Sequence, residues 1–201
     1  MRVFKKILSV LFAMVFMSLL FSHSVEAATP EAQIRKSVNG YIRSCRYYNL
    51  KKAKSYIHMK KDSRFYYIAD PDWNKYIKKA QKRFHAEITD IRINGNTALV
   101  DIDYGGVDLY FCVAHAWHNE LHEKGKIDVK RFNRYVIDEF KYALKHDDYC
   151  DFEYFMTIKL VKKKGKWKIE KPSKKIIRLF DGGATEAMRE IIAHPFKFYF
   201  L

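Results

Sequence analysis

Two stretches of this chain leave the periodicity of a helix for that of a strand, and a glycine turn divides each of them. In "AEITDIRI" and "TALVDIDY" polar and apolar residues alternate on either side of Asn94-Gly95-Asn96. Asn-Gly pairs readily adopt the positive φ angles that tight hairpin turns require. "FEYFMTIKLV" and "KWKIEK" repeat the arrangement around Gly165. The pattern predicts two β-hairpins and therefore four antiparallel strands.

Alternation along the second strand also predicts which side chains face the core. Ala98, Val100, Ile102 and Tyr104 share one face, and Leu99, Asp101 and Asp103 share the other. We expect Gly105-Gly106 to end this strand.

Apolar residues elsewhere recur at steps of three and four, which is typical of helices. The first helix is expected to begin at Thr29-Pro30-Glu31 and the second at Leu50, running to His58. A third starts at Asp72 and reaches Phe84. Asp108 and Asp128 are expected to cap two more helices between the hairpins, and short helices flank Gly182-Gly183. Helices segregated from an antiparallel sheet define an α+β domain. The buried stripe of the first helix is Ile34, Val38, Tyr41, Ile42, Cys45 and Tyr48.

The N-terminal residues carry the pattern of an export signal. Arg2, Lys5 and Lys6 precede the apolar run "ILSVLFAMVFMSLLF", and Val25-Glu26-Ala27 offers small residues for cleavage. The rival interpretation, an uncleaved anchor, needs about 20 apolar residues. We therefore expect a signal peptide at residues 1–27 cut after Ala27, one domain at 28–195 and an aromatic tail at 196–201. The mature protein is then secreted or extracytoplasmic, with no transmembrane segment.

The net charge of the chain indicates which classes of partner it favours. Without residues 1–27, 35 basic and 22 acidic residues leave a net charge of +13. In an exported protein this charge favours an envelope polyanion or another anionic surface, and the chain has no nucleic-acid motif, so no nucleic acid is expected. The lysines otherwise provide a solvated basic surface. The apolar tail is expected to dock on the domain, with an added strand, a partner or a membrane contact as alternatives.

Three cysteines, Cys45, Cys112 and Cys150, remain after cleavage. An oxidising compartment permits one bridge, and no spacing indicates the pair. Because Cys45 lies on the apolar stripe of the first helix, we expect it to be a buried thiol.

Several phrases resemble secreted bacterial members of the nuclear transport factor two-like superfamily, a cone-shaped α+β fold. They are "SVNGYIRSCRYYNLKKAKSYI", "DIRINGNTALVDIDY", "TIKLVKKKGKWKIEK" and "RLFDGGATEAM". The resemblance implies a curved sheet of about four strands packed against the N-terminal helices, with a helical insertion between the hairpins. It also implies that Trp167 packs on the inner face of the sheet, beneath the first helix. Isomerases, dehydratases and ligand carriers share this fold, so it fixes no activity.

Three groups of side chains are candidates for a site. Five aromatic residues either line a cavity in the cone, suited to a small apolar ligand, or fill it as core: Tyr41, Tyr48, Trp73, Tyr104 and Trp167. His115, His118 and His122 share a helix face that could chelate zinc, although the better interpretation is a solvated face. Asp101 and Asp103 could pair for acid–base chemistry, but their parity places both outside.

The sequence therefore predicts a non-enzymatic binding domain without a cofactor. It binds either a small apolar ligand in the cone or an anionic surface through its lysines. The alternatives are an isomerase- or dehydratase-like enzyme using the aromatic cavity, and a protein-interaction module that dimerises through the open sheet face. An inward-facing acid or histidine with a perturbed pKa would favour the enzyme.

Overall fold

The computed structural model describes residues 28–58, 71–124, 128–146, 151–170 and 174–194. The expected signal peptide, the aromatic tail and Cys150 lie outside this part. The described residues form an α+β fold with seven α-helices, one 3-10 helix and a mixed five-stranded sheet that is not closed. The sheet order is β1-β5-β4-β3-β2, with bounds Ile57–His58, Lys166–Glu170, Asp151–Lys163, Thr97–Val107 and His85–Asn94. No helix in this described part is long and apolar enough to cross a membrane.

Both predicted hairpins are confirmed. β2 pairs with β3, β3 with β4 and β4 with β5, all antiparallel. The expected end of β3 at Gly105-Gly106 is wrong, because the strand continues to Val107 and pairs both glycines with Glu153 and Phe152. A Cβ on Gly105 would lie 2.6 Å from the backbone oxygen of Phe152, so glycine allows the two strands to approach.

The helices follow the predicted order. They are α2 (Pro30–Arg46), α3 (Leu50–Ser55), η1 (Pro71–Trp73), α4 (Asn74–Ala80), α5 (Leu109–Lys124), α6 (Val129–Lys145), α7 (Lys174–Asp181) and α8 (Ala184–Ala193). Asp108 and Asp128 accept backbone N–H bonds at the starts of α5 and α6, as predicted.

The predicted second helix is too long. α3 ends at Ser55, and Ile57–His58 instead forms β1, which pairs parallel to β5. The reason is tertiary: the backbone N–H of Ile169 donates to the Tyr56 carbonyl at 2.9 Å, so the sheet edge captures this segment.

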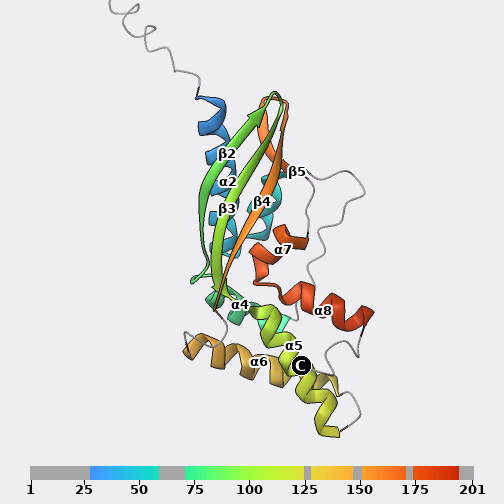
Figure 1. Ribbon diagram of the computed structural model, residues 1–201. Helices are drawn as coiled ribbons and strands as arrows, with labels where there is room; N and C mark the ends of the chain where they lie inside the picture. Colours follow the sequence, from blue (N-terminus) through green and yellow to red (C-terminus); the bar gives the residue numbers. More distant parts are fainter. Residues whose placement is uncertain (1–27, 59–70, 125–127, 147–150, 171–173, 195–201) are drawn as a thin grey trace, which may run out of the picture. The chain divides into compact units, whose positions relative to one another are not determined.

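A first hydrophobic cluster joins α2 and α7 to one face of the sheet (Figure 1). Trp167 is 4% exposed, and Ser37 Oγ of α2 donates to its carbonyl at 2.9 Å. Trp167 and Ile169 therefore point inward and Lys166 outward, as strand parity predicts. The α2 stripe is buried at Ile34, Val38, Tyr41 and Cys45.

A second cluster is built by α4, α5, α6 and α8. The Trp73 ring meets Phe140 edge-on at 5.9 Å between centroids. Glu120 of α5 has no exposed surface, and its carboxylate accepts from Arg131 Nε at 2.6 Å and from the backbone N–H of Asp128 at 2.6 Å. This carboxylate thus joins α5 to the start of α6.

Several contacts connect the two clusters. Tyr48 stacks on Phe180 at 4.9 Å, and its hydroxyl donates to Asn74 Oδ1 at 2.8 Å. The backbone N–H of Tyr110 donates to the Gly182 carbonyl at 3.1 Å. The α7–α8 turn is therefore held against the start of α5.

Replacing Trp167 with alanine is expected to lower the free energy of unfolding by roughly 3–5 kcal/mol, because it leaves a cavity in the first cluster. The control is Phe155→Ala, an aromatic residue of the same sheet that is 60% exposed, with an expected change within about 0.5 kcal/mol. Urea denaturation measures both. Equal effects would contradict the assignment of Trp167 to the core.

Replacing Glu120 with glutamine is expected to lower the urea midpoint, because it leaves the Arg131 guanidinium without its buried counter-charge. Asp138→Asn is the control, since Asp138 forms an exposed ion pair with Lys141 at 2.8 Å. The Glu120 variant should shift the midpoint several-fold more than the control does. Similar shifts of the urea midpoint in the two variants would show that the buried Glu120 carboxylate does not stabilise the contact between α5 and α6.

Candidate functional site

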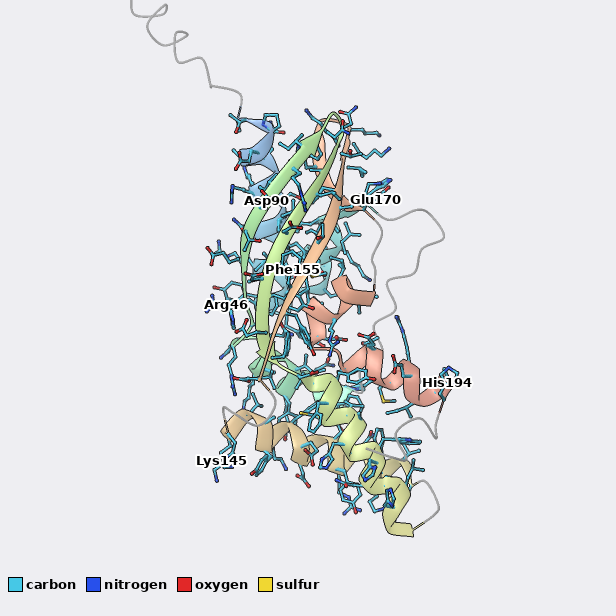
Figure 2. All side chains as sticks on the ribbon, viewed as in Figure 1. Arg46, Asp90, Lys145, Phe155, Glu170 and His194 are labelled. Atoms are coloured by element: carbon cyan, nitrogen blue, oxygen red, sulfur yellow. The ribbon has the colours of Figure 1, made fainter. Side chains whose placement is uncertain are left out.

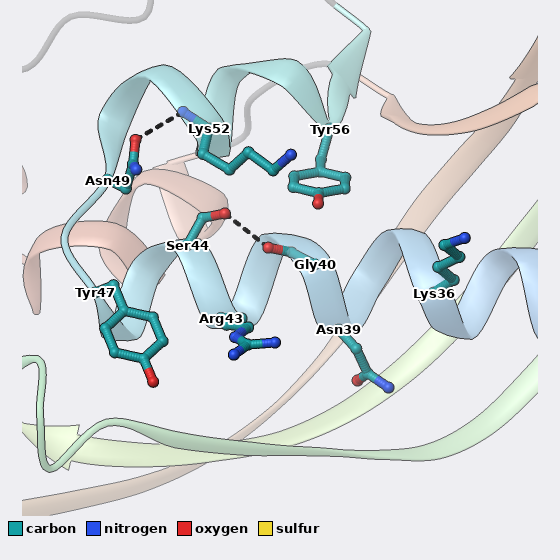
Figure 3. Close-up of a pocket in the computed structure, with 9 residues that line it drawn as sticks. All are labelled: Lys36, Asn39, Gly40, Arg43, Ser44, Tyr47, Asn49, Lys52 and Tyr56. Atoms are coloured by element: carbon teal, nitrogen blue, oxygen red, sulfur yellow. Dashed lines mark hydrogen bonds between the residues drawn. The ribbon is translucent and has the colours of Figure 1, made fainter.

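The α2–α3 groove is a cavity of about 600 Å³ between helices α2 and α3, open to solvent on one side (Figure 3). Its volume falls within the range of small-molecule sites. The residues that line it are Lys36, Asn39, Gly40, Arg43, Ser44, Tyr47, Asn49, Lys52 and Tyr56.

Helical spacing explains why α2 forms one wall of the groove. Lys36, Gly40 and Arg43 recur at steps of four and three, which places them on one stripe of the helix, and Tyr47 follows four residues later in the turn after Arg46. The buried stripe through Val38 lies on another side and packs in the first cluster. The same helix therefore presents one face to the core and another to the groove.

The opposite wall is Tyr56, whose ring lies directly over Gly40. A Cβ on Gly40 would lie 2.4 Å from the Tyr56 ring, so the close approach needs a glycine. Asn49 Oδ1 accepts from the backbone N–H of Lys52 at 3.0 Å and caps α3. The Tyr56 carbonyl accepts a hydrogen bond from the backbone N–H of Ile169 in β5, so the sheet holds this wall in place. The first cluster holds the α2 wall.

The lining carries three cations and no carboxylate. The Arg43 guanidinium carbon lies 5.8 Å from the centroid of Tyr47, and Lys52 Nζ lies 5.6 Å from that of Tyr56. Within the described residues, Lys36, Arg43 and Lys52 form no ion pair with a carboxylate. Other arginines do pair with carboxylates: Arg35, Arg83, Arg92, Arg131 and Arg178.

The groove can therefore attract and hold an anion. Arg43 offers a planar fork suited to a carboxylate or phosphate, and the lysines add point charges. Asn39 adds an exposed amide on the same wall.

The five aromatic candidates do not line this groove. Tyr41, Tyr104 and Trp167 belong to the first cluster and Trp73 to the second, while Tyr48 packs against both. The Tyr41 hydroxyl donates to the Ile176 carbonyl at 2.6 Å. These side chains are therefore distributed over two packed regions of the protein.

The three candidate histidines lie along α5. His115 Nδ1 is 2.9 Å from Glu139 Oε1, and the rings of His118 and His122 are 4.3 Å apart. Among the side chains that the structure describes, no three His, Cys, Asp or Glu residues are grouped to hold a metal ion.

The two candidate aspartates differ in their surroundings. Both lie on the outer face of β3, as predicted, and Asp103 is exposed. Asp101 is only 9% exposed. Arg92 and Thr157 each donate a hydrogen bond to its carboxylate at 2.6 Å. It is thus engaged in a local ion pair on that face.

Sequence reasoning missed Asp181, which has no exposed surface. Burial raises the pKa of its carboxyl to about 6, against hydrogen bonds that lower it. Its two oxygens accept from the backbone N–H groups of Gly183 at 3.0 Å and Thr185 at 3.1 Å, at the start of α8. The phrase "DGGAT", an acid three residues before a helix start, was the available signal.

Asp181 is close enough to three groups of α2 and its C-terminal turn to affect their ionisation. Burial is the main cause that raises the pKa of Tyr41, Cys45 and Tyr48. The negative charge of Asp181 adds a smaller effect in the same direction. Cys45 and Cys112 are both buried free thiols. The expected burial of the Cys45 thiol is confirmed.

The chain has no match among protein-family models, curated proteins or solved structures.

Replacing Asp181 with asparagine is expected to change how stability depends on pH. Its folded pKa of about 6 lies above the ordinary 3.8, so its contribution is full below about pH 4 and is lost as the pH rises through 6. Urea denaturation across this range should therefore show the wild type losing stability relative to Asp181→Asn. Parallel curves for the two proteins would contradict a buried carboxyl with a raised pKa.

Proposed function

We propose that this protein is an extracytoplasmic, non-enzymatic binding protein that takes an anionic ligand in the α2–α3 groove. The observation that carries the proposal is the cluster of Lys36, Arg43 and Lys52, which surrounds a cavity without any acidic side chain in its lining. Positive charges that line one cavity attract anions to it, and a bound anion lowers the repulsion among them.

The spacing of the cations favours a ligand with more than one anionic group. Lys36 and Arg43 are seven residues apart on α2, a rise of roughly 10 Å. Lys52 extends the positive charge to the second helix. A ligand with two or more phosphate or carboxylate groups would contact all three.

The proposed fold family is the nuclear transport factor two-like superfamily. Two features support it: the order of helices, hairpin, helices, hairpin and helices, and Trp167 packed between the sheet and α2. The parallel strand β1 is an addition to the expected sheet of four strands. The proposed export rests on the pattern of residues 1–27.

The enzyme alternative has one observation in its favour, the raised pKa of the inward-facing Asp181. However, this carboxylate has no exposed surface, and both of its oxygens accept backbone N–H groups of the α8 start. A catalytic acid or base must reach the substrate, whereas Asp181 caps a helix. The groove therefore supports binding better than the core supports catalysis.

Calorimetric titration with tripolyphosphate tests the proposal. Arg43→Gln is expected to weaken binding by roughly tenfold or more, since it removes a charge-assisted hydrogen bond. The matched control is Arg46→Gln, an exposed arginine of the same helix that does not line the groove, with an expected change within about twofold.

Two results would contradict the proposal. One is the absence of binding to the wild type, and the other is an equal loss of affinity in the two variants. The second result would indicate general attraction to a basic protein.

A further inference from the structure

The basic groove belongs to a larger basic face. Residues 30–58, which contain α2 and α3, hold seven basic side chains and one acidic one, Glu31, which pairs with Arg35 at 2.9 Å. All seven basic side chains are exposed: Arg35, Lys36, Arg43, Arg46, Lys51, Lys52 and Lys54. We name these seven residues the basic face.

The far side of the sheet has the opposite balance. The first cluster places α2 against the face that carries Val100 and Ile102, so the alternate residues of β2, β3 and β4 point away from α2. At these outer positions, which include Asp90 (Figure 2), six acidic side chains accompany three basic ones, Arg92, Lys159 and Lys163. The acidic residues are Glu87, Asp90, Asp101, Asp103, Asp151 and Glu153.

Because positive and negative charges lie on opposite sides of the unit formed by α2 and the sheet, this unit has a preferred orientation in an electric field. A negatively charged plane attracts the basic face and repels the acidic outer face, so both effects favour the same orientation. A protein whose lysines were evenly distributed would have the same net charge and no preferred orientation.

An aromatic side chain lies on the basic face. Tyr47 is 64% exposed, it follows Arg46 directly, and the Arg43 guanidinium lies over its ring. A phenol among cations suits the boundary between lipid headgroups and acyl chains, because its ring is apolar and its hydroxyl is polar.

We propose that the protein docks on an anionic phospholipid bilayer through the basic face, with the α2–α3 groove receiving a lipid phosphate. This inference rests on the proposed function, because three of its cations line the groove. The other four cations lie outside the groove lining, where a ligand confined to the cavity does not reach them. A charged plane contacts both sets at once, which favours a bilayer over a soluble polyanion.

The test is lysine acylation of the full chain, followed by mass spectrometry, with phosphatidylcholine vesicles or with vesicles that also contain phosphatidylglycerol. The anionic lipid is expected to protect Lys36 and Lys52 by roughly threefold or more. Lys159 and Lys163, on the outer face, should stay reactive. Residues 1–27 carry Arg2, Lys5 and Lys6 and so attract anionic vesicles as well, but the lysines of both faces share this contribution, and the comparison between the two faces removes it.

Two double variants with the same change in charge sharpen the test. Lys36→Gln/Lys52→Gln should reduce binding to the anionic vesicles, whereas Lys159→Gln/Lys163→Gln should leave it within about twofold of the wild type. Equal losses in the two variants, or equal protection of both faces, would overturn the oriented docking.

A third arm uses soluble polygalacturonate. If this polymer protects Lys36 and Lys52 and the anionic vesicles do not, the lipid inference is overturned while anion binding in the groove stands. Loss of tripolyphosphate binding would instead remove the proposed function itself, so the two failures are distinguishable.

Discussion

The packing of α2 on the inner face of the sheet is the interaction on which the other features depend. Its buried stripe shares the first cluster with Val100 and Trp167, and Ser37 ties the helix to the Trp167 backbone. This contact fixes the rotation of α2 about its axis. Once the rotation is fixed, the stripe of Lys36 and Arg43 must face α3 and solvent, and the outer positions of the strands must face away. Hydrophobic burial thus sets the position of the charges.

Asp181 and Glu120 perform comparable structural roles in the two clusters. Each carboxylate is buried, and each accepts backbone N–H groups at the start of a helix, α8 for Asp181 and α6 for Glu120. Glu120 also accepts from Arg131 Nε at 2.6 Å, whereas the charge of Arg189 lowers the pKa of Asp181 less than its hydrogen bonds do. This difference explains why the pKa of Glu120 is lowered despite its burial while that of Asp181 is raised. Buried acids here hold helices together.

The sequence predicted the elements well because their signals are local. The hairpins, the Asp108 and Asp128 caps and the direction of Trp167 all follow from periodicity and short-range chemistry. Features that need a distant partner were missed. β1 exists because β5 captures it, and Gly105 belongs to a strand because β4 extends alongside. The groove depends on Gly40 meeting Tyr56, and no periodicity in the sequence encodes that contact.

Backbone amide shifts recorded during titration of the protein with pyrophosphate would test the anion site most directly. Binding in the α2–α3 groove predicts shifts concentrated between Lys36 and Lys52, on both walls of the cavity. It also predicts saturation at one equivalent, with little change on β3 or α6. Small shifts spread over lysines throughout the protein, without saturation, would contradict a defined site and would leave only general attraction to a basic surface.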